Sequence, residues 1–495
     1  MLNLPHDLFS AEQISEIDRL VIEQHNVSTA TLMSRAGKAA LSTIRNHWPQ
    51  AERILILCGT GKNGGDGLEL ANQAIADGYR VAVIQVGDDP LGPETTAARD
   101  GYLATGSEIQ SFEGTLPSTD VVVDALLGTG LNREVTGDFK TIIEEINKIT
   151  RTPVLSIDIP SGLHADTGNP QNIAVKATNT LNFIGLNKGL FLGEGPNHSG
   201  VICFDSLQVP TAILKEFTPI ARRVSLENDA AQLLAPRQRT GHKGLYGHLL
   251  IIGGDHGMPG AARVAAEAGA RVGAGLTSIA TRADHGHTLN LTRPELMCYG
   301  VDDIKDLAPL IERANALTVG PGLGQTEWGE GLFQAAIDAN LPMVVDADAL
   351  NILSKNPQRH DNWVLTPHPG EAARLLGCSS AEIEADRFKA AQELQKRYGG
   401  IIVLKGSCSL INNGEVPTRL SAWGNPGMAS GGMGDVLAGV IGGLLAQGFP
   451  LMDAACVGVT LHGMAGDKAA EKDGERGMLA MDLIPHLRHL ANLIY

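Results

Sequence analysis

Short apolar runs of strand length recur along this chain, and segments with helical patterning separate them. In the first half, the runs begin at residues 54, 81, 121 and 154. Polar residues rarely interrupt them, which is typical of parallel strands buried on both faces of a sheet. The intervals between the runs fit successive strand–helix–strand units. The first half therefore predicts a doubly wound α/β domain.

A second series of strand-length runs begins at residue 248 and predicts a second α/β domain. Its later runs begin at residues 276, 316, 343, 363 and 401, and a helix is expected over 381–398. Between the two series, residues 207–240 lose the strand pattern and carry three prolines, which suits a junction. We therefore expect one domain over 1–220 and another over 221–495, because 495 residues suffice for several domains.

The charge balance and the cysteine pattern restrict the partners of the chain. Lysine and arginine number 39 against 55 aspartates and glutamates, and the net charge of −16 argues against a broad nucleic-acid-binding face. The six cysteines form no CxxC pair, which disfavours a zinc site and a disulfide framework. The N-terminus lacks the features of a secretion signal, and the longest apolar run, 436–446, is too short to span a bilayer. We expect a cytoplasmic protein that acts on small molecules, with no nucleic-acid or membrane partner.

A helix is predicted close to the N-terminus. Ser10 and Gln13 form a capping box at its start, and Ile14 and Ile17 fall on one face. We expect this helix to pack against the first domain and to take no part in its chemistry.

A glycine-rich segment directly follows the first strand of the first domain. It reads GTGKNGGDG over 59–67 and satisfies GxGxxG, with a helix expected over 68–76. Such glycines let the backbone approach a phosphate at the positive end of a helix, as in a Rossmann-like fold. The alternative is a turn that serves only chain geometry. Asn63 and Asp66 favour the binding role, since a plain turn needs neither polar side chain.

Two further strand ends of the first domain carry similar signals. Asp124 stands in DALLGTG, and Asp158 and Ser161 stand in SIDIPSG. Each aspartate by itself is as consistent with a helix cap as with catalysis. The carboxyl ends of adjacent parallel strands converge on one crevice, so three such ends predict one shared pocket.

These three motifs, in this order and spacing, resemble the N-terminal domain of the NAD(P)H-hydrate epimerases over about residues 10–215. The resemblance implies that Asn63, Asp124 and Ser161 help to hold a potassium ion. It also implies that Asp158 faces the nicotinamide ring, as the acid/base of the reaction. The implied hydrate-binding residues are Lys62, Asn63, Gly64, Gly65, Asp66, Gly128, Thr129, Gly130, Leu131, Asn132, Arg133, Glu134 and Asp158. Lys62 replaces the asparagine of many family members; it either favours an additional phosphate or is simply solvated.

The most specific motif of the second half is GNPGMASGGMGDVLAGVIGGLLAQG, over 424–448. Its apolar residues fall on one helical stripe, and Gly439 lies among glycines that allow close packing. SGGMGD places free backbone N–H groups at the helix start and Asp435 in the first turn. A transferring phosphoryl group fits there, with Asp435 as the base for the attacking hydroxyl. The alternative is that Asp435 only stabilises the helix dipole, by about 0.3–1 kcal/mol.

This signature resembles the ribokinase-type fold. With HKGLYGHLLIIGG, VGPGLG, VVDADAL, LTPHPGE and VLKGS, it is similar to the ADP/ATP-dependent NAD(P)H-hydrate dehydratases over about residues 225–495. The implied hydrate contacts are Ala261, Gly322, His368 and Asp435, and the implied nucleotide contacts are Lys405, Gly406, Ser407, Cys408, Ser409 and Gly434. Met433 departs from the usual threonine of GGTGD.

Four residues of these motifs have simpler interpretations. His368, between two prolines, is also consistent with a rigid turn, and Lys405 with an ordinary solvated lysine. For Asp346 and Asp348, capping of the following helix is favoured over assistance to magnesium.

The two resemblances together imply a bifunctional enzyme that repairs hydrated NADH or NADPH. The first domain would interconvert the R and S epimers. The second would dehydrate the S epimer with ADP or ATP and magnesium. Family habit implies a homo-oligomer. The alternative is a small-molecule or vitamin kinase joined to a non-catalytic N-terminal binding module.

Overall fold

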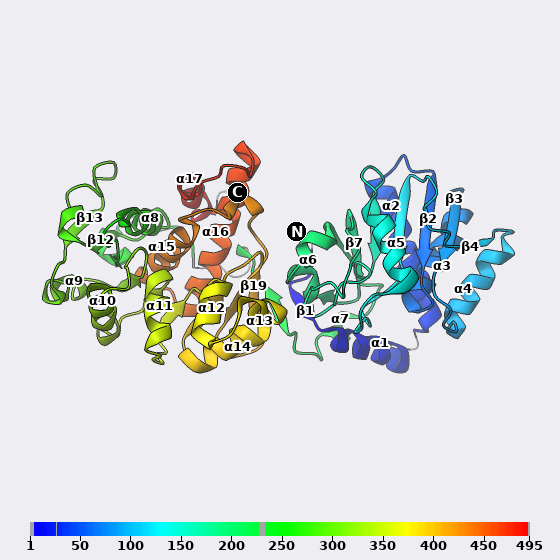
Figure 1. Cartoon of the computed structure of the whole chain (residues 1–495), viewed down its shortest axis with the longest axis horizontal. Helices are drawn as coiled ribbons and strands as arrows, with labels where there is room; N and C mark the ends of the chain where they lie inside the picture. The colour runs from blue at the N-terminus through cyan, green and yellow to red at the C-terminus, as the bar shows by residue number, and fades with distance from the viewer. Residues whose placement is uncertain (1–3, 26, 227–232, 494–495) are drawn as a thin grey trace. The chain divides into compact units, whose positions relative to one another are not determined.

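The structure is a computed structural model that describes residues 4–25, 27–226 and 233–493 (Figure 1). The chain divides into two compact units, residues 1–221 and 222–495. Each unit contains a sheet of mainly parallel strands covered by helices, so the predicted α/β class is confirmed. In the described ranges, no helix combines the length and the apolar character needed to cross a membrane.

The first unit contains a seven-stranded parallel sheet in the order β4-β3-β2-β5-β6-β7-β9. These strands are β2 (Arg53–Cys58), β3 (Arg80–Gln85), β4 (Ile109–Ser111), β5 (Val121–Ala125), β6 (Val154–Ile157), β7 (Asn179–Phe183) and β9 (Val201–Asp205). The main helices are α1 (Ala11–His25), α2 (Thr29–His47), α3 (Lys62–Ala76), α4 (Pro93–Ala104) and α5 (Gly137–Asn147). The shorter elements are β1 (Asp7–Phe9), which pairs with β8 (Leu186–Asn187), and η1 (Lys188–Phe191), α6 (Gly195–Ser199) and α7 (Thr211–Leu214).

Alternate residues of β2 pack on opposite faces of this sheet. Ile54 and Ile56 join a cluster with α1 to α4, whereas Leu55 and Leu57 join a cluster with α5. The chain runs outward from β2 to β4 and returns to β5 on the other side of β2. This reversal of strand order creates a crevice at the carboxyl ends of β2 and β5.

The second unit has a nine-strand run in the order β13-β12-β11-β14-β15-β16-β17-β18-β19, parallel as far as β17. The strands are β11 (His248–Ile252), β12 (Leu276–Thr281), β13 (Met297–Gly300), β14 (Ala316–Val319), β15 (Met343–Val345), β16 (Trp363–Leu365), β17 (Ile401–Leu404), β18 (Ser409–Asn412) and β19 (Thr418–Ser421). The helices are α8 (Pro259–Arg271), α9 (Ala308–Ile311), α10 (Glu327–Asp338), α11 (Ala347–Lys355), α12 (Pro369–Leu376), α13 (Ser380–Ala385), α14 (Arg387–Tyr398), α15 (Met433–Ala446), α16 (Leu451–Asp473) and α17 (Ala480–Leu490). Short 3-10 turns are η3 (Lys243–Tyr246), η4 (Ala283–His285), η5 (Ile304–Asp306) and η6 (Pro426–Met428), and β10 (Ala221–Arg223) stands at the boundary of the units. The strand order reverses between β11 and β14, which places a second crevice there.

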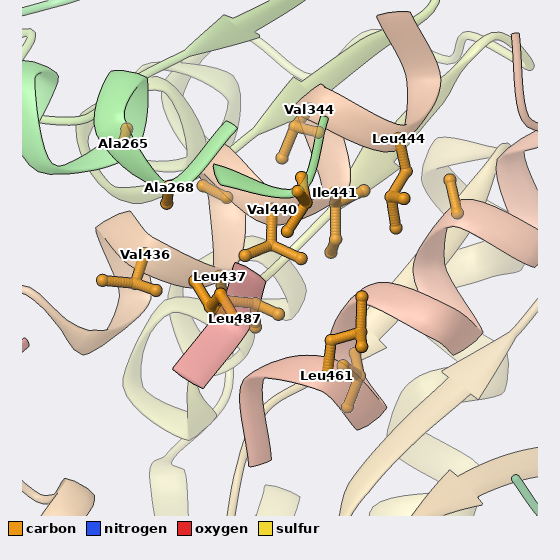
Figure 2. Packing of buried hydrophobic residues seen from close by; sticks show 14 of the residues in the cluster. Ala265, Ala268, Val344, Val436, Leu437, Val440, Ile441, Leu444, Leu461 and Leu487 are labelled. Atoms are coloured by element: carbon orange, nitrogen blue, oxygen red, sulfur yellow. The ribbon is translucent and has the colours of Figure 1, made fainter. Parts of the chain in front are cut away.

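Helix α15 lies at the centre of the second core. Figure 2 shows Val436, Val440 and Leu444 of α15 packed among residues of neighbouring elements, such as Ala265 of α8. A side chain at Gly439 would collide with the backbone carbonyl of Ala265. The glycine therefore permits close packing of two helices. The residues of the predicted apolar stripe are buried, and the glycine and alanine residues outside it are buried as well, so α15 is covered on nearly all sides.

Two predicted helix boundaries are wrong for local reasons. The helix expected over 381–398 is interrupted at Asp386, whose carboxylate accepts a hydrogen bond from Lys389 N at 3.0 Å and caps α14. The helix expected over 68–76 already begins at Lys62. The glycine-rich segment therefore supplies the first turns of α3, and the backbone N–H groups of that turn stand at the crevice.

Candidate active sites

A cavity of about 470 Å³ occupies the crevice of the first unit. Its wall combines the start of α3 with the segments that follow β5, β6 and β7. The lining includes most of the predicted hydrate-binding residues, namely Lys62, Asn63, Asp66, Gly128, Thr129, Gly130, Leu131, Asn132, Arg133 and Asp158. Gly64 and Gly65 instead pack against Gly59 and Met33, and Glu134 is exposed.

Helix α1 also contributes to this cavity. Ile14 and Asp18 are among its lining residues, so α1 borders the cavity in addition to packing on the core as predicted. The predicted capping box is confirmed: Ser10 Oγ accepts from Gln13 N at 3.1 Å, and Gln13 Oε1 accepts from Ser10 N at 3.1 Å. The apolar periodicity of α1 gave no indication that Asp18 faces a pocket.

Asp158 lies at the end of β6 with a left-handed backbone, φ 67°. Its Oδ2 accepts a hydrogen bond from Thr129 N at 3.2 Å, and its carbonyl accepts one from Asn182 Nδ2 at 2.9 Å. Burial raises the pKa of Asp158 to about 6, although the hydrogen bonds from Thr129 oppose this. A carboxyl group that titrates near neutral pH can both accept and donate a proton.

A second carboxylate, Asp66, faces the same cavity from α3. Burial, followed by the charge of Asp158, raises the pKa of Asp66 well above its ordinary value. Lys62 Nζ lies 3.7 Å from Asp18 Oδ2, and the Lys62 side chain is 70% exposed. Lys62 thus belongs to the rim of the cavity, where it counteracts the negative charge of Asp18 and Asp66.

The three residues implied in potassium binding have different surroundings. Asn63 is 8% exposed, and neither atom of its side-chain amide has a hydrogen-bond partner among the described residues. Asp124 is fully buried: Oδ1 accepts from Ser161 Oγ at 2.5 Å, and Oδ2 accepts from Ser156 Oγ at 2.7 Å. Burial raises the pKa of Asp124 despite these bonds. Neither Asp124 nor Ser161 lines the cavity.

In the second unit, the functional residues gather at the start of α15. Gly432 precedes the helix with φ 89°, and Asp435 stands in its first turn. A Cβ atom at Gly434 would lie 3.3 Å from Lys405 Nζ and 3.5 Å from Asp346 Oδ2. Glycine therefore leaves room beside a cation and a carboxylate at a helix N-terminus, where an anionic ligand is favoured.

A charged network surrounds this helix start. Lys405 Nζ lies 2.8 Å from Asp346 Oδ1 and 3.8 Å from Glu371 Oε2. Burial raises the pKa of Asp435 to about 7, and the charge of Asp346 adds to this, whereas Lys405 opposes it. Burial likewise raises the pKa of Glu371 to about 7. Asp435 is thus poised to take a proton near neutral pH.

The simpler interpretations of Asp346 and Lys405 are wrong. Asp346 occupies the N-cap position of α11, but its side chain makes no capping hydrogen bond. Its carboxylate binds Lys405 instead, and the Lys405 side chain is only 19% exposed. Asp348 accepts a hydrogen bond from Gly324 N at 2.9 Å. An aspartate between a strand and a helix looks the same in the sequence whether it caps the helix or forms an ion pair. The sequence alone therefore did not separate these two roles.

The implied hydrate contacts come from three elements. A Cβ atom at Gly322, φ 59°, would lie 3.2 Å from Ala261 Cβ, so these two residues adjoin at the second crevice. His368 caps α12: its Nδ1 accepts from Gly370 N at 3.0 Å, while Glu371 Oε2 accepts from His368 N at 2.8 Å. Burial lowers the pKa of His368.

The implied nucleotide segment 405–409 is held by Arg387, which sequence reasoning missed. Arg387 is buried, and its Nη2 donates to the carbonyl oxygens of Leu404, Lys405 and Cys408 at 3.0–3.1 Å. Cys408 itself is buried. The sequence carries no signal for this role, because the burial of Arg387 and its carbonyl partners depend on how α14 packs against β17 and β18.

Comparison with known proteins assigns a family to each half of the chain. Residues 29–189 match the family described as the YjeF-related protein N-terminus, and residues 249–489 match the family described as NAD(P)H-hydrate dehydratase. The bifunctional NAD(P)H-hydrate repair enzyme of Coxiella burnetii is 45% identical, over 98% of this chain and 99% of that protein.

Two solved structures resemble part of the chain. A ribokinase-like superfamily protein from Enterococcus faecalis is 27% identical with a TM-score of 0.51, covering 56% of this chain and 98% of that one. The ADP/ATP-dependent NAD(P)H-hydrate dehydratase from Bacillus subtilis, co-crystallised with ATP and Mg²⁺, is 32% identical with a TM-score of 0.49, covering 52% and 94%.

Fold and sites define an α/β enzyme that joins a doubly wound unit to a ribokinase-like unit, each with a buried carboxylate at a sheet crevice. The chain belongs to the bifunctional NAD(P)H-hydrate repair enzymes. The family predicted from the motifs is thereby confirmed, and the alternative of a vitamin kinase with a non-catalytic module is not supported.

Proposed function

We propose that residues 1–220 epimerise NADH and NADPH hydrates and that residues 221–495 dehydrate the S epimer at the expense of ADP or ATP. The observation that carries this proposal is the presence of two separate buried carboxylates with pKa values near neutrality, Asp158 and Asp435. Each stands where a parallel sheet ends in glycine-rich segments. Two proton-transfer sites in one chain fit two successive reactions on one substrate.

In the epimerase, Asp158 is the acid/base. Inversion at C6 of the hydrated ring requires either ring opening or loss and return of the hydroxyl group, and both need proton transfer to or from oxygen. Asp158 lines the cavity and accepts a hydrogen bond from Thr129 N at 3.2 Å, which orients its carboxyl group. The residues Lys62, Asn63, Asp66 and Gly128–Arg133 surround the hydrate, with Gly64, Gly65 and Glu134 in supporting positions.

Potassium would bind beside this site through Asn63, Asp124 and Ser161. The orphaned amide of Asn63 fits a cation ligand, since a buried carbonyl oxygen without a partner is costly. A bound potassium ion would supply positive charge next to the reacting ring. Asp124 and Ser161 hold each other, and Leu127 N donates to Ser161 Oγ at 2.8 Å, which fixes the segment after β5.

In the dehydratase, Asp435 takes the proton of the C6 hydroxyl as that oxygen attacks the terminal phosphorus of the nucleotide. The bond from this phosphorus to its bridging oxygen breaks, releasing ADP from ATP or AMP from ADP. The ring nitrogen lone pair then expels phosphate from C6, and loss of a proton from C5 restores the double bond. Ala261, Gly322 and His368 position the hydrate.

Lys405 and Gly434 lie together and would face the nucleotide phosphates, with Gly406, Ser407, Cys408 and Ser409 completing the nucleotide contacts. Among the described residues, no group of three or more His, Cys, Asp or Glu side chains is arranged to hold a metal ion. Magnesium therefore fits here as an ion that arrives with the phosphates, which is its usual mode of binding. A cytoplasmic location and a homo-oligomeric state complete the proposal, on the family resemblance.

The test is recovery of reduced nicotinamide absorbance from a mixture of R and S NADPH hydrate, with magnesium, potassium and either ADP or ATP. Full recovery is expected, with one phosphate released per cofactor restored. A stable phosphorylated product without recovery would support a kinase instead. If only the S portion is recovered, after correction for spontaneous epimerisation, the first unit is not an epimerase.

A further inference from the structure

A second, smaller cleft lies in the second unit, where the segment after β14 meets α11 and α12. Its volume is about 370 Å³, and its lining residues are Gln325, Asn351, Ser354, Lys355 and Arg374. They include two cations and no carboxylate, although the chain carries a net charge of −16. The lining therefore offers hydrogen-bond donors and positive charge, which suits an anionic group.

The two cations of this cleft are available to a ligand. Arg374 Nε donates to Asn351 Oδ1 at 2.8 Å, which fixes the plane of the guanidinium and leaves both Nη groups to point elsewhere. Within the described ranges, neither Arg374 nor Lys355 forms an ion pair with a carboxylate. The neighbouring carboxylate, Asp348, is engaged by Gly324 N and by Gln325 Nε2, at 2.9 and 3.3 Å.

The cleft is lined by segments that also carry residues proposed to contact the hydrate. Gln325 follows Gly322 by three residues, and Arg374 belongs to α12, which His368 caps. Arg374 Nη1 lies 3.9 Å from the position of a Cβ atom on Gly370. The charge of Arg374 also contributes to the lowered pKa of His368.

Part of the cleft lies on α11 beyond Asp348, a residue whose charge acts on Asp435. Along α11, Lys355 is seven residues beyond Asp348, or about 10 Å at 1.5 Å per residue. A dinucleotide whose nicotinamide ring lies at Asp435 must extend its phosphates away from that point. The distance is of the size of a nucleotide rather than of a single ring.

We propose that this cleft binds a phosphate group of the hydrated dinucleotide. The inference rests on the proposed function and specifies its substrate class. Arg374 presents two Nη groups to the oxygens of a phosphate, and Lys355 adds a point charge. Ser354 Oγ donates to Asn351 O at 2.7 Å, so the neutral donor left to a ligand is the second amide hydrogen of Gln325 Nε2, beside its bond to Asp348 at 3.3 Å. The phosphate is either the 2′-phosphate of NADPH hydrate or the pyrophosphate that both hydrates share.

Arg374→Gln and Lys355→Gln test the proposal in the full-length protein, with kcat and KM measured for S-NADH hydrate, S-NADPH hydrate and ATP. Each substitution is expected to raise the hydrate KM about ten-fold, the usual effect of losing a charged hydrogen bond, with kcat and the KM for ATP within about two-fold. A rise in KM for NADPH hydrate alone would identify the 2′-phosphate as the group that the cleft binds. An equal rise in KM for both hydrates would identify the pyrophosphate as that group.

Lys389→Gln is the matched control, because Lys389 is 70% exposed on α14 and pairs only weakly with Glu393, at 3.9 Å. It should change neither hydrate KM. Arg374→Gln also removes the bond to Asn351, so its melting temperature is compared with that of the wild type. Lys355→Gln breaks no hydrogen bond described here, and its KM effect does not depend on packing.

With an active wild type, unchanged hydrate KM values in both variants would overturn the proposal that the cleft binds a phosphate of the hydrate. A rise in the KM for ATP instead would overturn it as well. A wild-type protein that dehydrates neither hydrate would refute the proposed function itself. The two failures are therefore distinguishable.

Discussion

The two units place a catalytic carboxylate in contrasting electrostatic surroundings. Burial is the first cause of the raised pKa of both Asp158, about 6, and Asp435, about 7. Hydrogen bonds from Thr129 oppose this effect at Asp158, whereas the charge of Lys405 opposes it at Asp435. Burial therefore raises both pKa values, and the main opposing effect comes from neutral dipoles in one unit and from a full positive charge in the other.

This difference fits the two proposed reactions. Epimerisation moves a proton and a hydroxyl group within a partly apolar cavity and transfers no phosphoryl group. Phosphoryl transfer brings several negative charges together, and the cation Lys405 beside the helix start stabilises them. The cavity wall of the first unit accordingly includes apolar side chains of α1 and α2, such as Ile14 and Leu32, while glycine leaves the second site open to an anion.

The largest expected effect separates the two activities at Asp435. Asp435→Asn keeps the shape of the side chain but removes the base, so dehydration should fall by about 10³-fold or more. Epimerisation should be unchanged. Absorbance of reduced nicotinamide measures the first rate, and chromatographic separation of the epimers measures the second. Asp473→Asn is the matched control, because the Asp473 side chain on α16 is 77% exposed. Dehydration at the wild-type rate in Asp435→Asn would refute the assignment of Asp435 as the base.

The reciprocal experiment addresses Asp158. Asparagine tolerates the left-handed backbone at φ 67°, so Asp158→Asn removes the titrating group without adding strain. Epimerisation is expected to fall by about 10²-fold, while S-hydrate dehydration persists. Exposed Asp100 on α4, changed to Asn, is the control. Loss of both activities would mean that the two units do not act independently.

The elements and the two central carboxylates were accessible from sequence because their signals are local. A buried parallel strand is a continuous apolar run, and Asp158 and Asp435 each stand directly beside a glycine-rich strand end or helix start. The break at Asp386 was missed because a capping residue inside a helical pattern looks like any other polar residue.

The surroundings of those carboxylates were not accessible, because they depend on which segments meet in space. Lys405 and Asp346 are 59 residues apart and meet because β15, β16 and β17 are neighbours. Asp18 reaches the first cavity from a helix that precedes the sheet. A periodic pattern gives the inward face of a helix, but it does not tell whether that face meets a core or a pocket.

The third prediction compares the stability of the two units. A methyl group at Gly439 would meet the carbonyl oxygen of Ala265, so Gly439→Ala should destabilise the second unit by about 3 kcal/mol. Gly260→Ala is the matched control, since nothing lies within 4 Å of a Cβ atom at that helical position; it should be neutral or slightly stabilising. Thermal unfolding followed by dehydratase activity measures the change. Equal loss of epimerase activity on heating would show that the units unfold together.

The smallest effect concerns pH and tests the charge network directly. Asp435 must be ionised to act as a base, so dehydration should decline as the pH falls through about 7. Asp346 raises the pKa of Asp435 and also holds Lys405 at 2.8 Å. Asp346→Asn removes the negative charge that repels ionised Asp435 and frees Lys405 from its ion pair. The pKa of Asp435 should therefore fall, and the acidic limb of the pH–rate profile should move to lower pH.

We expect the ratio of dehydration rates at pH 6 and pH 8 to rise about three-fold in Asp346→Asn. Lys405→Met should move the limb in the opposite direction, because it removes the group that lowers the pKa of Asp435. The ratio, rather than the absolute rate, is the readout, since both substitutions also weaken nucleotide binding. Epimerisation, with its own limb near the pKa of Asp158, serves as the internal control and should not move. An acidic limb of dehydration that stays at the same pH in both variants would mean that burial by itself sets the pKa of Asp435. Lys405 and Asp346 would then act on the nucleotide alone.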